Sequence, residues 1–83
     1  MNELMAMTNI GKVAATRLID VGIDTPEKLI ATGSMDAFLA VRLRDPGACL
    51  DMLYALEGAI EGVRWHSLPA VKKQELKSFF NSL

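Results

Sequence analysis

Residues that commonly carry catalysis or hold metals are scarce in this 83-residue chain, which has one cysteine, Cys49, and one histidine, His66. A nucleophilic thiol needs a base within hydrogen-bond reach and a third group that orients the base. A structural zinc site needs four ligands, more than one cysteine and one histidine supply. Cys49 falls on an apolar stripe, where we expect a core thiol, and the Glu57/Glu61 pair indicates a solvated helix face. The sequence therefore predicts no enzyme activity, no metal, no cofactor and no small-molecule substrate.

Long apolar runs are also missing from the chain. No stretch approaches the ~18–20 apolar residues that a membrane span needs. The segment 1–4 has no positive region followed by an apolar stretch of the kind that signal peptides carry. A lone cysteine cannot form an internal disulfide, which is typical of a reducing compartment. We therefore expect a cytoplasmic protein with no membrane partner.

An excess of charge of one sign is absent as well, because nine basic residues face ten acidic ones and the net charge is -1. A stand-alone nucleic-acid binder usually has a basic domain, since neutralising phosphates supplies most of its non-specific affinity. Any contact of this chain with DNA must therefore be local and weak. Trp65 could stack on a base, but its place before a Leu-Pro helix start predicts a cover for the edge of the core.

Apolar residues, by contrast, make up 51% of the chain, and glycines and capping residues divide it into short helical segments. Thr25, Pro26 and Glu27 have the order of an N-cap, a first helical residue and an acidic first turn. Gly33 and Gly62 fall where helices end. The predicted helical segments are residues 2–7, 12–21, 26–33, 34–43, 48–61 and 69–81.

Segment 48–61 is the longest apolar one and is predicted to be the central helix. Its inner face has apolar residues at spacings of four and three: Cys49, Leu53, Leu56, Ile60 and Val63. Gly58 within it costs ~1 kcal/mol relative to alanine, which indicates a close helix–helix contact. In the flanking helices we expect these side chains to face inward: Met35, Phe38, Leu39, Leu43, Val71, Leu76, Phe79, Phe80 and Leu83. No strand-like alternation is present, so the prediction is an all-α bundle of five or six short helices.

Residues 7–18 carry the most informative motif, Met-Thr-Asn-Ile-Gly-Lys-Val-Ala-Ala-Thr-Arg-Leu, which resembles a helix-hairpin-helix pattern. Asn9 stands where that pattern usually has glycine, and asparagine is the next best residue at a left-handed backbone angle. Gly11 permits close backbone approach at a helix start. Free backbone N–H groups there could meet a phosphate oxygen, with Lys12 beside them. The candidate nucleic-acid-binding residues are Thr8, Asn9, Gly11 and Lys12, and a purely structural corner between helices is the alternative.

A longer set of residues carries a family resemblance. It comprises Leu4, Asn9-Ile10-Gly11-Lys12, Leu18, residues 21–25 (Val-Gly-Ile-Asp-Thr), Leu29, Gly33, residues 53–62 (Leu-Tyr-Ala-Leu-Glu-Gly-Ala-Ile-Glu-Gly), Trp65, Leu68-Pro69 and Leu76. On these residues the chain is similar to the C-terminal domain of the TfoX/Sxy regulators of natural competence. The resemblance implies one SAM-like helical domain over residues 1–83, with a helix-hairpin-helix-like element and a role in transcriptional activation of competence genes. It implies no enzyme activity and no cofactor. Family regulators carry a separate N-terminal domain, whereas this sequence begins directly before the C-terminal domain, so we expect either a stand-alone relative or a part cut from a longer regulator.

Two functions remain open on the sequence alone. The first is a regulatory module that binds a transcription-related protein, or a second copy of itself, through its helical faces. The second is weak, sequence-independent binding of the duplex DNA backbone at the turn 8–12. The near-neutral charge favours protein contact, and the turn favours DNA contact.

Overall fold

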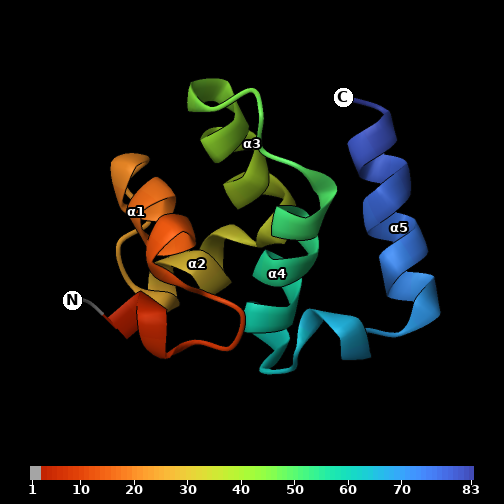
Figure 1. The fold of residues 1–83 in the computed structure, drawn as a ribbon, viewed down its shortest axis with the longest axis horizontal. Coiled ribbons are helices and arrows are strands. Elements are labelled where there is room, and N and C mark those ends of the chain that lie inside the picture. The colour runs from red at the N-terminus through yellow and green to blue at the C-terminus, as the bar shows by residue number, and fades with distance from the viewer. Residues whose placement is uncertain (1–2) are drawn as a thin grey trace.

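The computed structural model describes residues 3–83, and within that range the regular elements are all helices, with no strand. Figure 1 shows the order of the elements along the chain. They are the 3-10 helix η1 (Glu3–Ala6), the α-helices α1 (Lys12–Asp20), α2 (Pro26–Thr32), α3 (Ser34–Arg44) and α4 (Leu50–Glu61), the 3-10 helix η2 (Trp65–Ser67) and α5 (Ala70–Asn81). The all-α prediction is confirmed.

The helix boundaries follow the capping signals of the sequence. The Thr25 side-chain oxygen accepts a hydrogen bond from the backbone N–H of Lys28 at 3.1 Å, and Pro26 is the first residue of α2. Gly62 ends α4 in the left-handed conformation, at φ 75°. The opening segment differs from the prediction, because it forms the short helix η1; Asn2 lies outside the described residues.

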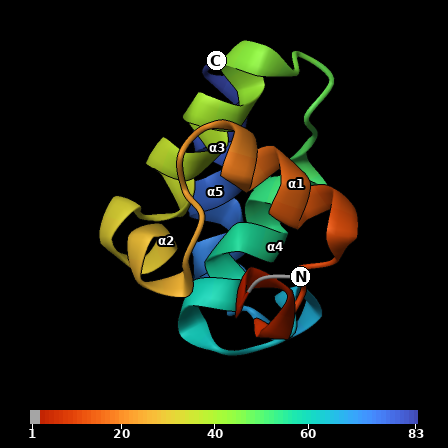
Figure 2. The same cartoon turned by 90° about the vertical axis from the view of Figure 1, so that its left-hand side faces the viewer.

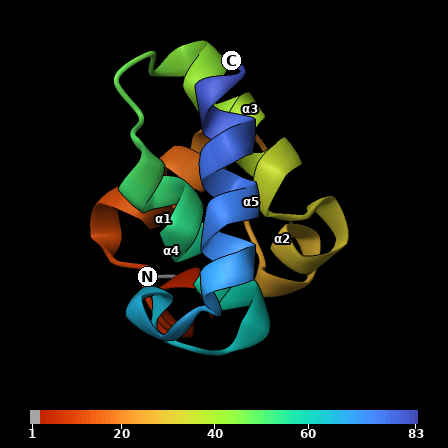
Figure 3. The same ribbon diagram turned by 90° about the vertical axis from the view of Figure 1, so that its right-hand side faces the viewer.

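Helix α4 lies at the centre of the molecule. It packs against α2, α3, α5 and η2. Figures 2 and 3 show it between α1 and α2 on one side and α5 on the other. Leu53 and Leu56 of α4 are fully buried, which confirms the predicted central helix. The core around them contains Leu4, Leu18, Leu29, Phe38, Val41 and Leu76.

Some side chains predicted to face inward are exposed instead, most of all Leu43 at 87% and Val71 at 80%. At about 100° per residue, Leu43 lies about 200° around α3 from the buried Val41. Val71 lies five positions before the buried Leu76, or about 140° away around α5. Leu39 lies about 200° around α3 from the buried Ala37 and Val41 and is also exposed. The helical phase therefore turns these residues away from the core.

Three further residues that were predicted to face the core are exposed, because each lies just outside the helix to which the apolar pattern assigned it. Cys49 is exposed, since α4 begins only after it and Cys49 itself has an extended backbone. Val63 follows the left-handed Gly62 and is exposed. Leu83 follows the end of α5 and is 49% exposed.

Candidate functional site

The turn before α1 is built around Asn9, which has a left-handed backbone at φ 73°, as predicted for this position. Its side-chain amide Nδ2 donates to the carbonyl oxygens of Val63 at 2.9 Å and Ala55 at 3.4 Å. Its Oδ1 accepts a hydrogen bond from the backbone N–H of Trp65 at 3.2 Å. We call these three hydrogen bonds the Asn9 bridge. They connect the turn to the middle of α4 and to the segment that follows this helix.

Gly58 makes the Asn9 bridge sterically possible. A Cβ at Gly58 would collide with Asn9 Nδ2 and lie 2.7 Å from the carbonyl oxygen of Val63 and 3.2 Å from the Cα of Trp65. The close contacts that the glycine permits are thus with the turn before α1, with Val63 and with Trp65 at the start of the 3-10 helix η2, rather than with another α-helix. A helical glycine and a left-handed asparagine, 49 positions apart, form one structural unit.

The N-terminus of α1 is open to solvent. Its N-cap, Gly11, has an extended backbone, and no side chain caps the helix. Among the hydrogen bonds of the described residues, none uses the backbone N–H groups of Lys12, Val13 or Ala14. A Cβ at Gly11 would meet nothing within 4 Å, and both Gly11 and Lys12 are exposed. The free backbone N–H donors of the helix N-terminus and the charge of Lys12 are therefore found at the same exposed position.

Of the four predicted binding residues, the structure brings Gly11 and Lys12 together at this open end. Thr8 is half-buried, and the Asn9 side chain is already engaged in the Asn9 bridge. The element before the turn, η1, is a 3-10 helix of four residues. The helix-hairpin-helix assignment and the phosphate-binding role of these residues remain predictions.

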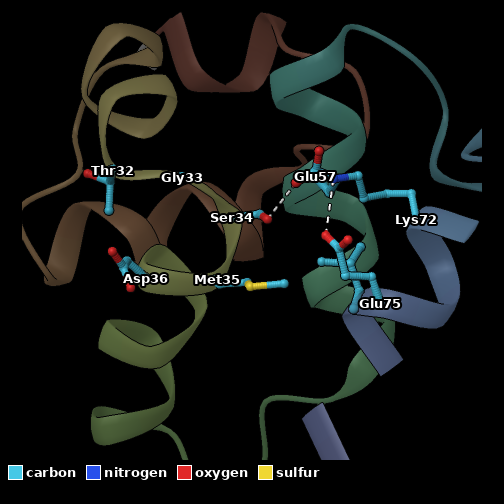
Figure 4. A pocket seen from close by; sticks show the side chains of 9 residues that line it. Thr32, Gly33, Ser34, Met35, Asp36, Glu57, Lys72 and Glu75 are labelled. Carbon is cyan, nitrogen blue, oxygen red and sulfur yellow. Dashed lines mark hydrogen bonds and ion pairs between the residues drawn. The ribbon is translucent and has the colours of Figure 1, made fainter. Parts of the chain in front are cut away.

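A polar pocket of about 330 Å³ lies where the α2–α3 junction faces α4 and α5. Figure 4 shows Ser34 pointing to Glu57 and Lys72 pointing to Glu75 across it. The Ser34 hydroxyl donates to Glu57 Oε1 at 2.6 Å, and Lys72 Nζ lies 3.3 Å from Glu75 Oε1. Glu57, Lys72 and Glu75 therefore each already have a polar partner within the chain.

The pKa values of the neighbouring carboxyl groups of Glu57 and Glu61 are shifted in opposite directions. Burial raises the pKa of Glu57, but hydrogen bonds with Glu61 and Ser34 and the charge of Lys72 outweigh this and leave the pKa below its ordinary value. The hydrogen bond with Glu57 raises the pKa of Glu61, and burial and the negative charge of Glu57 act in the same direction. A proton on Glu61 is thus stabilised by the neighbouring carboxylate.

Trp65 and His66 lie in one aromatic stack. Trp65 packs against the core and stacks on Tyr54, with ring centroids 5.7 Å apart, as expected for a cover at the core edge. His66 stacks on Trp65 at 3.9 Å. In the described part of the chain no group of three or more His, Cys, Asp or Glu side chains could hold a metal ion. No described helix is both long and apolar enough to cross a membrane.

An apolar hollow lies at the end of the molecule where α3 ends, away from the Asn9 bridge (Figure 1). Its volume is about 460 Å³, and we call it the α3–α5 groove; it is lined by Leu39, Arg42, Leu43 and Leu83. Figure 1 shows the end of α3 and the C-terminus at the same end of the molecule. Three of the lining residues are exposed leucines, and Leu43 is the most exposed large hydrophobic residue of the described chain.

This groove was not predicted from the sequence, because its three leucines have the composition of core residues and Arg42 belongs to no motif. One signal was available. Helix α3 has apolar residues on every side (Met35, Ala37, Phe38, Leu39, Ala40, Val41 and Leu43). One core cannot cover such a short helix all round, so part of its apolar surface is left for another contact.

Comparison with known proteins gives the relationships of the chain. A family model described as the TfoX C-terminal domain matches residues 1–80. The fold is similar to the crystal structure, in a triclinic form, of an uncharacterized protein from Listeria monocytogenes, with a TM-score of 0.94 and 49% sequence identity over 95% of this chain and 90% of that one. A tetragonal form of a protein of unknown function from Listeria monocytogenes gives the same score and identity over 95% of this chain and 98% of that one. No curated protein matches the chain.

Proposed function

Because the chain belongs to the TfoX C-terminal domain family, we propose that it is a non-catalytic domain that helps to regulate the transcription of competence genes by binding another protein. The observation that carries this proposal is the α3–α5 groove, an apolar hollow with three exposed leucines. Burying a leucine side chain contributes about 1.5–3 kcal/mol. Leu43 alone, which is 87% exposed, would therefore add appreciably to the stability of a complex.

Several features favour a protein over DNA as the main partner. The net charge of the chain is -1, and the groove is lined by three leucines and a single cation. Phosphate contacts need several basic groups on one face to reach useful affinity. An apolar groove at the end of two helices suits an amphipathic helix of a transcription-related protein.

Peptide display tests this proposal. Random helical peptides are selected on the wild-type domain, and binders are measured by fluorescence anisotropy against Leu43→Asn and Val71→Asn. Both substitutions replace an exposed apolar residue, but Val71 does not line the groove. We expect Leu43→Asn to weaken binding about tenfold or more, which corresponds to about 1.4 kcal/mol, and Val71→Asn to leave it unchanged. Failure to select binders, or equal losses in both variants, would contradict the proposal.

The regulatory part of the proposal is tested in cells that lack their own copy of the gene. Wild type and the Leu43→Asn and Val71→Asn variants are produced at equal levels, and competence-gene transcripts are quantified. The proposal predicts that wild type and Val71→Asn restore these transcripts and that Leu43→Asn does not. Transcripts that respond to none of the three proteins would contradict a regulatory role.

Contact with the DNA backbone is a second candidate, favoured by the free N–H groups of residues 12–14 and the open space beside Gly11. A labelled duplex titrated at low salt should bind weakly and without sequence preference. The slope of log K against log salt should be shallow, near −0.9 per phosphate contact. Lys12→Glu should reduce binding while the helical content stays the same. Absence of wild-type binding, or identical binding by both proteins, would leave the turn as a structural corner.

A further inference from the structure

The guanidinium of Arg42 lies beside two aromatic rings at the wall of the α3–α5 groove. Its central carbon lies 5.0 Å from the ring centroid of Phe80 and 6.0 Å from that of Phe38. Phe38 belongs to the buried core, and Phe80 packs against it. Two aromatic rings from α3 and α5 therefore position the cation before any ligand arrives.

This guanidinium has no acidic partner in the described chain. Its Nη1 is buried without a hydrogen-bond acceptor, and no ion pair involves Arg42. Arg17, by contrast, pairs with Asp45 at 2.7 Å. No carboxylate side chain lines the groove, where Arg42 stands among three leucines. A partly desolvated cation without an acceptor is costly. Because Nη1 itself is covered by the chain, a partner's carboxylate would pair with the other N–H groups of this half-buried guanidinium, for which it is the best acceptor.

We propose that the α3–α5 groove binds an acidic amphipathic helix of a partner protein, whose leucine-like side chains cover Leu39, Leu43 and Leu83 and whose Asp or Glu pairs with Arg42. This inference rests on the proposed protein-binding function and specifies the chemistry of the partner. The rings of Phe38 and Phe80 already restrict the guanidinium, so pairing requires little further ordering of that side chain. A surface lysine would offer a looser, fully hydrated charge.

A second copy of the chain fits the groove less well. Closed dimers pair the same surface patch of both subunits around a two-fold axis. In such a dimer each Arg42 would face the partner's copy of the same groove, whose lining supplies no carboxylate side chain. Each guanidinium would therefore be covered without gaining a side-chain carboxylate, which costs binding energy. Charge complementarity therefore favours an acidic partner of different sequence.

The experiment uses the intact chain and the helical peptides selected on it. Peptides that depend on Leu43 should be enriched in Asp or Glu next to apolar residues at helical spacing. Arg42→Met keeps an apolar stem against Phe80 and removes the charge, and we expect it to weaken binding roughly tenfold or more. Arg44→Gln removes an equal charge from an exposed neighbour outside the groove, and it should change affinity less than about twofold, well under the effect of a buried charged hydrogen bond.

The peptide provides a test that leaves the fold untouched. Replacing its acidic residue with Gln should give the same loss on wild type and no further loss on Arg42→Met, because each change removes the same pair. Leucine-dependent binders without acidic residues, or equal effects of Arg42→Met and Arg44→Gln, would overturn this inference and leave the proposed function standing. If no binder depends on Leu43, both this inference and the proposed function are contradicted. A dimer in sedimentation that Leu43→Asn dissociates would also overturn the inference, because the groove would then pair two copies.

Discussion

Replacing Gly58 with alanine separates two opposing effects in α4. Helix propensity alone favours alanine over glycine by about 1 kcal/mol. In this fold, however, the added Cβ would lie 2.7 Å from the carbonyl oxygen of Val63, 3.2 Å from the Cα of Trp65 and in collision with the Asn9 amide. Two of these three neighbours are backbone atoms, which cannot move aside as the end of a flexible side chain can.

The size of the loss can be worked from these contacts. Overpacking a well-packed site costs about 1–3 kcal/mol. Displacing the Asn9 amide weakens the hydrogen bonds of the Asn9 bridge, each contributing about 0.5–1.5 kcal/mol. These losses exceed the gain in propensity, so we expect Gly58→Ala to lower the free energy of unfolding by about 1–4 kcal/mol. Urea unfolding followed by circular dichroism measures this value.

A second variant tests whether Asn9 causes part of this loss in the free energy of unfolding. Asn9→Gly keeps a residue that accepts φ 73° but removes the amide. In that background Gly58→Ala should cost at least about 0.5 kcal/mol less than in wild type, because one of the clashing groups is gone. Stabilisation of the wild type by Gly58→Ala, or an equal cost in both backgrounds, would refute the steric coupling.

Three further predictions concern the core, the carboxyl pair and the turn. Leu56→Ala should lower the free energy of unfolding by about 2–5 kcal/mol, because Leu56 is fully buried in the central helix; a loss under about 1 kcal/mol would mean that α4 is not central. Glu61→Gln should be more stable than wild type at neutral pH and lose that advantage toward about pH 4. The folded state raises the pKa of Glu61, so the protonated Glu61 side chain stabilises the fold at low pH, and this stabilisation is lost as the pH rises through the raised pKa. Urea midpoints of wild type and variant that differ equally at both pH values would contradict this prediction. Gly11→Ala should change the free energy of unfolding by less than about 1 kcal/mol, since its Cβ would meet nothing, and a larger loss in urea would show that the turn needs glycine there.

Local signals predicted the elements of the fold well. The Thr25–Pro26 start of α2, the end of α4 at Gly62 and the left-handed Asn9 all depend on the conformational preferences of single residues. The central helix was predicted from apolar spacing alone, because Leu53 and Leu56 fall on a stripe that the rest of the chain covers.

Properties that depend on residues distant in the sequence were not predictable in this way. Leu43 and Val71 have the composition of core residues, and only the helical phase relative to Val41 and Leu76 reveals that they face solvent. The role of Gly58 depends on Asn9, which no local pattern connects to it. For the same reason the α3–α5 groove, with Arg42 between two aromatic rings, emerged only from the packing of α3 against the end of α5.

An amide NMR titration tests the central claim most directly. The labelled domain is titrated with a selected acidic amphipathic peptide and, in a parallel series, with duplex DNA at low salt. Binding at the α3–α5 groove predicts saturable shifts on adding peptide that cluster at residues 39–43 and 80–83 and vanish in Leu43→Asn. Peptide shifts confined to residues 8–14, or spread without saturation, would contradict the account.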